Sequence, residues 1–199
     1  MRRVPVLISV LAVVLAGLFG VGLTATLAQP ATPAPTWGTA AAATMQDTAG
    51  KMVGTALLAE RPDGTVYVSV VALGLVPGDH GIHAHETGAC DPAGDKPFTS
   101  AGGHFNPTEA EHGAHAGDLG NATANADGLA KFELTTDRFA LATGATPLLD
   151  SDGAAIVLHA NPDENDPEGK SFGGRIACGV LTTVAAPAMA GTAPVAPSA

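Results

Sequence analysis

Positively charged residues are scarce in this chain. It has 9 Lys and Arg against 19 Asp and Glu among 199 residues, for a formal net charge of −10. A protein that binds nucleic acid uses a basic stripe or patch to displace counterions, and the few scattered basic residues form none. We therefore exclude nucleic acid as a partner. The length leaves room for one domain.

Aromatic residues and helical periodicity are scarce as well. Phe, Trp and Tyr make up 4% of the chain, whereas Gly contributes 25 residues and Pro 15. No segment keeps an apolar period of 3.6 residues, so long amphipathic helices are not expected. Short apolar stretches instead recur between Gly, Pro and Asp turns, which is typical of an all-β, antiparallel sandwich or barrel.

The clearest local signal is a β-hairpin. Residues 51–60 and 65–73 flank the turn Arg61-Pro62-Asp63-Gly64, and Val66, Val68 and Val70 share one face of the second strand. The predicted strands are residues 51–60, 65–73, 121–124, 129–135, 154–159 and 175–182. Two connections, residues 86–120 and 160–173, stay long and irregular, and long connections in a compact domain are often functional.

Both ends of the chain differ in composition from the middle. Residues 1–28 join Met1-Arg2-Arg3 to an uncharged apolar run, which predicts either a cleaved signal peptide or a retained N-terminal membrane anchor through residues 4–28. Cleavage after Ala28 would change the net charge from −10 to −12 by removing two arginines. Ala, Pro and Thr dominate residues 29–44 and 183–199, which predicts a linker and a low-complexity tail around a domain at 45–182. We expect an exported protein that is periplasmic, at the cell surface or extracellular.

The chain has seven histidines, and six of them fall between His80 and His115. In an extended backbone His83 and His85 lie on one face, so two imidazoles can meet one metal ion. Two further groups of candidates are His104 with the more distant His159, and the closely spaced trio His112, His115 and Asp118. Several imidazoles suit copper or zinc, and imidazoles with one carboxylate suit tetrahedral zinc. A site for calcium or magnesium, built from oxygen alone, does not fit.

Five segments carry a family resemblance, in this order along about 100 residues: HGIHAHE (80–86), SAGGHFNP (100–107), HAGDLGN (115–121), IVLHANPD (156–163) and GGRIACGV (173–180). They resemble copper/zinc superoxide dismutase of the exported bacterial type. The resemblance implies an all-β fold, an antiparallel Greek-key β-sandwich or flattened barrel with two long functional loops. It also implies that the protein dismutes superoxide anion to dioxygen and hydrogen peroxide, and it is compatible with a homodimer.

The resemblance implies a role for each site residue. Copper would be held by His83, His85, His104 and His159, and zinc by His104, His112, His115 and Asp118. His104, as the bridge between the metals and a proton carrier, and Arg175, as the group that attracts and positions superoxide, would be catalytic. Asp163 and His80 would support the metal ligands, and Cys90 and Cys178 would form a disulfide.

Two departures from the family pattern bear on these assignments. Only Gly113 and Ala114 separate His112 from His115, where the family usually has a longer excursion, so the zinc geometry follows less directly than the copper geometry. The loop at 160–173 is shorter than in the eukaryotic enzymes and contains Glu168 and Lys170, to which we assign no steering role. Asn121-Ala122-Thr123 matches a glycosylation sequon by pattern, which we interpret as incidental.

Two alternative functions use the same sandwich. A copper-binding module for storage or delivery would bind metal without turnover, and it could lose Arg175, His104 or the zinc ligands. A structural adhesion domain would carry its histidines incidentally and would bind neither metal. The complete set of matching residues favours the enzyme.

Overall fold

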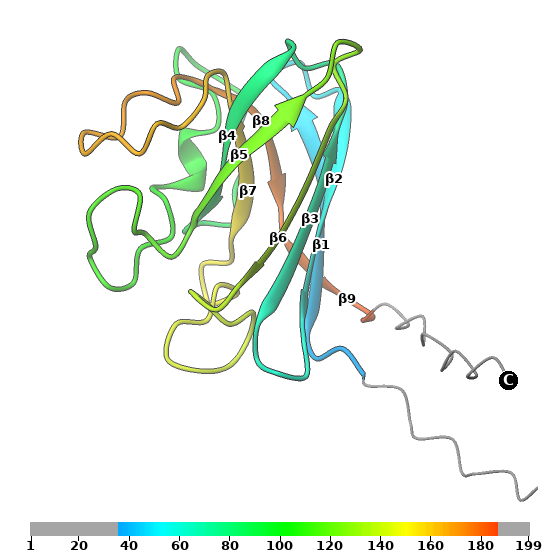
Figure 1. Cartoon of the computed structure of the whole chain (residues 1–199), viewed down its shortest axis with the longest axis vertical. Coiled ribbons are helices and arrows are strands. Elements are labelled where there is room, and N and C mark those ends of the chain that lie inside the picture. Colours follow the sequence, from blue (N-terminus) through cyan, green and yellow to red (C-terminus); the bar gives the residue numbers. More distant parts are fainter. Residues whose placement is uncertain (1–35, 187–199) are drawn as a thin grey trace, which may run out of the picture. The chain divides into compact units, whose positions relative to one another are not determined.

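The structure, a computed structural model of the chain, describes residues 36–186 (Figure 1). Its strands are β1 (Ala40–Asp47), β2 (Met52–Glu60), β3 (Val66–Ala72), β4 (Gly78–His85), β5 (Asp118–Ala124), β6 (Ala130–Thr136), β7 (Ala155–His159), β8 (Arg175–Val180) and β9 (Thr182–Val184). Helical structure in this range is limited to the 3₁₀ turn η1 (Thr99–Ala101). No helix of the described range is long and apolar enough to cross a membrane.

Eight of the strands close into an antiparallel barrel. The order around it is β1, β2, β3, β6, β5, β4, β7 and β8, and β8 pairs with β1 to complete the circle. The chain leaves β3, crosses to β4, and returns through β5 and β6 to lie beside β3, which is a Greek-key connection. β5 and β6 pair only at Ala124 and Ala130, so the barrel is loosely joined there. The predicted all-β Greek-key fold is confirmed.

The predicted hairpin is β2 and β3. Their register runs without a break from Glu60 opposite Val66 to Gly54 opposite Ala72. Along β3 the buried and half-buried residues alternate, with Val66, Val68 and Val70 in the core, as the period of two requires. Gly64, at φ 85°, takes the left-handed conformation that the turn needs.

β4 and β7 differ from β3 because they are buried on both faces. Ile82 and Ala84 of β4 point into the barrel core, whereas His83 and His85 lie on the outer face. The two long connections, residues 86–117 and 160–174, lie on this side of the barrel (Figure 1). The first loop packs Phe98 against the outer face of β7 and β8 in a second, smaller apolar cluster. The first loop is therefore packed against the sheet despite its length.

The predicted boundary of the linker at residue 44 is wrong. β1 begins at Ala40, so residues 40–44 of the expected linker belong to the barrel. Ala41 and Ala43 are buried, and the backbone pairs with β2 from Ala40 to Gln46. Alanine side chains give only a weak apolar pattern in the sequence, so the strand was not predicted. In the fold, backbone hydrogen bonds to β2 hold these residues in the sheet. The tail boundary is also wrong by two residues, because β9 extends to Val184; residues 1–35 and 187–199 lie outside the described range.

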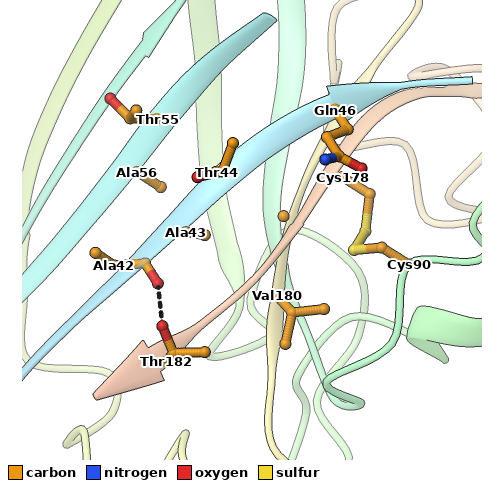
Figure 2. A pocket seen from close by; sticks show the side chains of 11 residues that line it. Ala42, Ala43, Thr44, Gln46, Thr55, Ala56, Cys90, Cys178, Val180 and Thr182 are labelled. Carbon is orange, nitrogen blue, oxygen red and sulfur yellow. Dashed lines mark hydrogen bonds between the residues drawn. A yellow bond between two sulfur atoms is a disulfide. The ribbon is translucent and has the colours of Figure 1, made fainter. Parts of the chain in front are cut away.

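β1 changes its partner from β9 to β8 across a gap between the strands. It pairs with β9 at Ala42 opposite Thr182 and with β8 at Gln46 opposite Cys178. A pocket of about 490 Å³ lies at this gap. Figure 2 shows its lining, which consists mostly of small residues. The predicted strand 175–182 is thus interrupted at Leu181, whose amide donates to the carbonyl of Ala154, the residue before β7.

The disulfide joins the first long loop to β8. Cys90 and Cys178 are 88 residues apart in sequence and their Cα atoms are 5.7 Å apart. Cys178 is buried beside Phe98, at one end of the pocket in Figure 2. The pairing implied by the resemblance is confirmed, and it fastens the loop to the sheet.

We expect the double variant Cys90→Ser/Cys178→Ser to unfold more easily than the parent. A cross-link over 88 residues restricts the unfolded chain by about 4–5 kcal/mol in the loop-entropy model. Urea unfolding of the metal-free protein measures this difference. Reducing the disulfide of the parent should give the same midpoint as the variant, and a reductant should not affect the variant; equal midpoints for the variant and the oxidised parent would contradict this account.

Candidate metal centre

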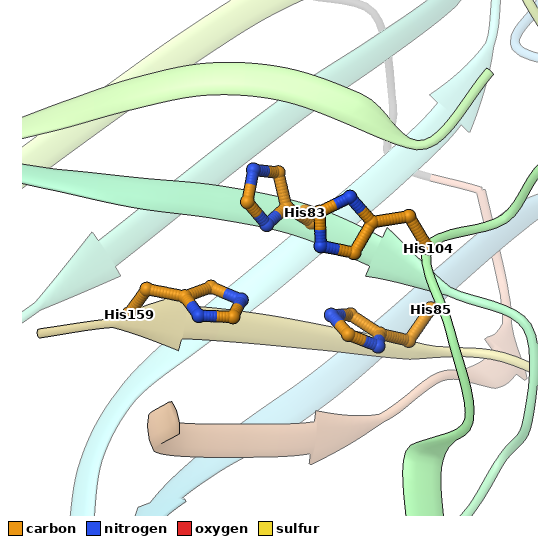
Figure 3. A group of neighbouring side chains, drawn as sticks. All are labelled: His83, His85, His104 and His159. Carbon is orange, nitrogen blue, oxygen red and sulfur yellow. The ribbon is translucent and has the colours of Figure 1, made fainter. Parts of the chain in front are cut away.

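Four histidines meet on the outer face of the barrel, next to the two long loops (Figure 3). Two come from β4, one is the last residue of β7, and one lies in the loop before β5: His83, His85, His159 and His104. A β-bridge between His85 and His104 holds the loop against the end of β4. One ligand nitrogen of each histidine lies within 4.8 Å of those of the others. The resemblance implies these four as copper ligands.

Three of these imidazoles have one nitrogen anchored and one nitrogen without a partner. The anchors are His83 Nε2 to Asp163 Oδ2 at 2.7 Å, His85 Nδ1 to Gly102 O at 3.1 Å, and His159 Nδ1 to Gly173 O at 3.3 Å. The other nitrogens, His83 Nδ1, His85 Nε2 and His159 Nε2, are buried and have no hydrogen-bond partner. A buried polar atom without a partner is costly unless something binds it. The donor set therefore fits a metal ion that favours imidazole.

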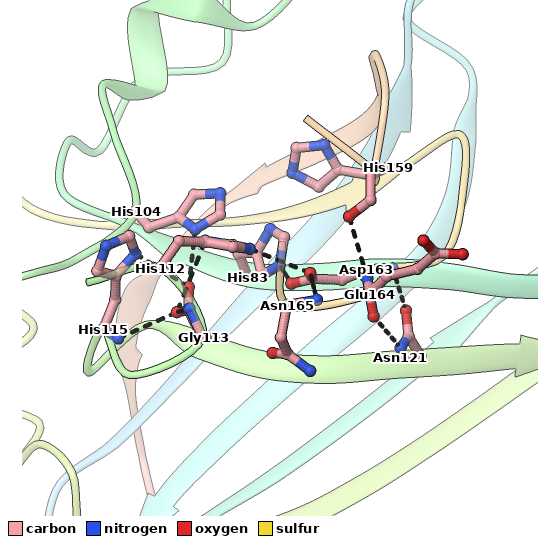
Figure 4. A network of polar contacts seen from close by, with 12 residues as sticks. His83, His104, His112, Gly113, His115, Asn121, His159, Asp163, Glu164 and Asn165 are labelled. Carbon is pink, nitrogen blue, oxygen red and sulfur yellow. Dashed lines mark hydrogen bonds and ion pairs between the residues drawn. The ribbon is translucent and has the colours of Figure 1, made fainter. Parts of the chain in front are cut away.

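The second group shares His104 with the first. Its other members are His112, His115 and Asp118, with ligand atoms also within 4.8 Å of one another (Figure 4 draws the histidines). His104 Nδ1 lies 2.7 Å from Asp118 Oδ1, which leaves His104 Nε2 as the nitrogen available to the first group. Three imidazoles and one carboxylate fit tetrahedral zinc. These are the four residues that the resemblance implies as zinc ligands.

The short spacing between His112 and His115 is accommodated by a tight turn. Gly113 has φ 88°, a left-handed conformation that favours glycine. The amides of Gly113 and His115 both donate to Asp118 Oδ2, at 2.7 and 3.0 Å. The carboxylate thus organises the segment that carries the two histidines, and a longer excursion is not needed to bring them together.

Asp163 connects the two groups through hydrogen bonds to one histidine of each. Its Oδ2 contacts His83 of the first group and its Oδ1 lies 3.0 Å from His112 Nε2 of the second (Figure 4). Asn121 holds the backbone of Asp163 on both sides, by accepting from its amide at 2.7 Å and donating to its carbonyl at 2.9 Å. An aspartate that fixes one nitrogen of a metal-binding imidazole sets the ring's orientation.

Burial keeps the imidazoles of the first group neutral. It lowers the pKa of His83 to about 4 and that of His159 to about 3, and it also holds the pKa of His85 well below its usual range. Burial alone would raise the pKa of Asp118, but its hydrogen bond and charge interaction with His104 outweigh that effect and lower it. Neutral imidazoles and an ionised carboxylate are the forms that bind metals.

Arg175 starts β8 beside His159, to which it is paired in register. Its guanidinium donates to Phe98 O at 2.5 Å and to Gly102 O at 2.6 Å, and Gly102 O is also the partner of His85. Within residues 36–186 no carboxylate lies within ion-pair distance of Arg175, so its charge is not neutralised. The side chain is half-buried next to the first group of histidines.

His80 belongs to neither group. Its Nδ1 contacts His159 O and its Nε2 contacts Val76 O, both at 2.8 Å. It ties the backbone of β7 to the segment that precedes β4, which supports His159 through the main chain. Glu168 and Lys170 pair with each other at 2.5 Å in the exposed second loop.

Sequence reasoning missed two residues next to the centre. Asn121 was interpreted as part of an incidental sequon and received no role as the last residue of the segment at 115–121, yet its half-buried amide is hydrogen-bonded to Asp163. The ring of Phe172 packs against four of the histidines, with its centroid 4.4 Å from that of His159. Phe172 is the one aromatic residue in a second loop that is otherwise polar and rich in glycine. That isolated aromatic residue was the sequence feature that could have indicated a packing role.

Comparison with known proteins agrees with this geometry. Residues 52–181 match the family described as copper/zinc superoxide dismutase (SODC). The chain is 39% identical to a superoxide dismutase (Cu-Zn) of Deinococcus radiodurans, in an alignment covering 71% of this chain and 84% of that protein.

Two solved structures share the fold. A SOD-like protein from Bacillus subtilis has a TM-score of 0.64 and 35% identity, covering 73% of this chain and 99% of that one. A Cu/Zn superoxide dismutase from Brucella abortus has a TM-score of 0.57 and 30% identity, covering 72% of this chain and 99% of that one. A match of the family over β2 to β8 and both groups of ligands shows that this chain belongs to the copper/zinc superoxide dismutase family.

Proposed function

We propose that this protein is an enzyme that dismutes superoxide: two superoxide anions and two protons give dioxygen and hydrogen peroxide. The observation that carries the proposal is the set of three buried, unpartnered imidazole nitrogens that converge with His104. We assign copper to His83, His85, His104 and His159, and zinc to His104, His112, His115 and Asp118. Bound copper would supply one-electron redox chemistry, and zinc, a d10 ion, would contribute no redox step.

The protein's part begins with holding the imidazoles in place. Asp163 and the carbonyls of Gly102 and Gly173 each anchor one ring nitrogen, so the opposite nitrogen keeps a fixed direction. His104 is the ring common to both groups. When His104 Nε2 is not bound to metal, it is the atom on which we place a transferable proton, because Nδ1 faces Asp118 and the second group. A proton held there lies next to the first group, where the reduced substrate needs it.

Arg175 is the group we assign to substrate binding. Two of its N–H groups are committed to backbone carbonyls, which fixes the guanidinium beside His85 and His159. A guanidinium has further N–H donors, and these can bind a small anion. The chain as a whole is negative, so this local positive charge must overcome a repulsive field to attract superoxide.

The alternative, a copper-binding module without turnover, is not favoured. Such a module has no need of an unpaired arginine beside the copper ligands or of a second set of ligands that shares one histidine. The described residues contain both features.

We further propose that the protein is exported, through residues 1–28 as a cleaved signal or as a retained anchor, with residues 29–39 as a linker and 185–199 as a tail. The disulfide is compatible with an oxidising compartment. Sequencing the mature N-terminus distinguishes the two forms: a start near Gln29 means release, and an intact Met1 or Arg2 means anchoring. The homodimer stays a prediction that sedimentation can test.

The first test removes the metal ligands. Purified parent protein loaded with copper and zinc should consume superoxide, and His104→Ala and His159→Ala should lower the rate more than about 100-fold. Thr135→Ala, on an exposed strand position away from the centre, serves as the control and should keep the parent rate. An unaltered rate in both histidine variants would exclude this assignment.

Arg175→Glu should slow turnover about tenfold at low ionic strength, because it reverses the local charge that attracts the anion. Asp127→Asn removes one acidic charge from an exposed turn and keeps a residue that suits the turn. We expect it to raise the rate much less. Rates measured over a series of salt concentrations separate the two effects; equally small changes would contradict local steering.

The metal-free protein should lose stability on acidification. The lowered pKa values of His83 and His159 mean that the unfolded chain, with histidine near 6.5, takes up protons first. Stability is therefore full above about pH 6.5 and falls as the pH drops toward about 3, the lower of the two pKa values. Urea unfolding at pH 7.5 and pH 5 measures the change, and a midpoint that is higher at pH 5 would contradict it.

A further inference from the structure

Phe172 is held at the base of the second long loop, next to β7. The loop closes as a hairpin, because Asn161 N donates to Phe172 O at 2.9 Å and Ala160 N donates to Gly174 O at 2.8 Å. Gly173 has φ 69°, and a Cβ there would lie 2.6 Å from Asn161 Nδ2. These contacts fix the backbone on both sides of Phe172. Its ring position is therefore set by the barrel and not by the exposed tip of the loop.

The ring packs against both groups of ligands. It meets His159 and His83 edge to face, with centroids 4.4 and 5.0 Å apart. It also contacts the shared His104 at 5.1 Å and His112 of the second group at 5.4 Å. These separations lie in the range in which aromatic rings attract one another. One side chain thus contacts two ligands of the first group, the common ligand and one ligand of the second group.

β4 leaves space for this ring. Gly81 lies on the same outer face of the strand as His83 and His85. A Cβ at Gly81 would lie 3.0 Å from Phe172 Cβ and 3.4 Å from His83 Cε1. The row of outward side chains on β4 is therefore interrupted at Gly81, where Phe172 packs. A side chain at residue 81 would displace the ring, so this loop–strand contact depends on glycine.

On its outer side Phe172 forms a wall of a surface cavity of about 360 Å³. The cavity is also lined by His104, His112, His115 and Glu168, whereas His83, His159 and Arg175 do not line it. The ring contacts His83 and His159 on its inner side. Phe172 therefore separates the cavity from two of the proposed copper ligands.

We infer that Phe172 is a positioning residue of the metal centre: it holds His104 between the two groups and closes His83 and His159 to water on the side of this cavity. The inference rests on the proposed function, because it requires metals at both groups. An apolar ring in this place would make metal release slow without contributing a ligand.

The experiment uses the full chain loaded with copper and zinc and compares the parent with Phe172→Ala, Phe172→Leu and Phe172→Tyr. Phe132→Ala, a truncation of the same size at a half-buried position of β6, controls for general loss of packing. Release of copper and zinc to excess EDTA is followed in time. The visible absorption and electron paramagnetic resonance spectra of bound Cu(II) report the geometry of the ligands.

We expect Phe172→Ala to release both metals about tenfold faster and to change the Cu(II) spectra, as loss of a residue that orients metal ligands does. Phe172→Tyr should restore the parent values, and Phe172→Leu should lie between. If the alanine variant does not fold, a faster release from Phe172→Leu than from Phe172→Tyr carries the same test.

Parent-like release and spectra in both Phe172→Ala and Phe172→Leu, or an equal effect of Phe132→Ala, would overturn the inference. If the variants behave like the parent while the parent binds both metals and consumes superoxide, the proposed function stands and only the role of Phe172 is removed. A parent protein that binds no copper would overturn both.

Discussion

The structure depends on burying imidazole rings on the outside of a barrel. The outer face of β4 and the end of β7 carry histidines whose free nitrogens have no partner in the protein, and each such nitrogen costs on the order of 1–3 kcal/mol when it is shielded from water. Both long loops pack over this face, the disulfide fastens the first loop, and Asp163 and two carbonyls anchor the opposite nitrogens. The barrel is in this sense a support for a polar cluster that a bound cation would satisfy.

The net charge of the chain and the local charge beside the first group of histidines have opposite signs. The chain carries a formal charge of −10, whereas the region beside the first group of histidines contains a guanidinium without an acidic partner among the described residues. The lysine of the second loop does not add to this region, because Lys170 is paired with Glu168. The positive potential that an anion would meet therefore depends on Arg175 and on whatever metals are bound, which confines attraction to a small area.

Much of the fold and of the site could be predicted because both signals are local. The alternation of Val66, Val68 and Val70 and the parity of His83 and His85 follow from the strand period of two, and both agree with the structure. β1 could not be recognised, since its alanines carry little apolar signal and its stability comes from pairing with distant strands. Asn121 and Phe172 were missed for the same reason: each acts on residues about 40 or more positions away or on several rings at once, and no spacing in the sequence encodes such contacts.

The pairing of β1 with β9 has a topological consequence. Ala40 at the start of the barrel is the register partner of Val184 at its end, so the chain enters and leaves the fold at neighbouring points, away from the two long loops (Figure 1). Chains with adjacent ends tolerate circular permutation. Joining residues 40 and 184 through a short peptide and opening the chain at the β2–β3 turn would keep the strands and their neighbours. The packing of the strands therefore does not depend on where the chain begins and ends. Several chain connectivities would be compatible with the same barrel.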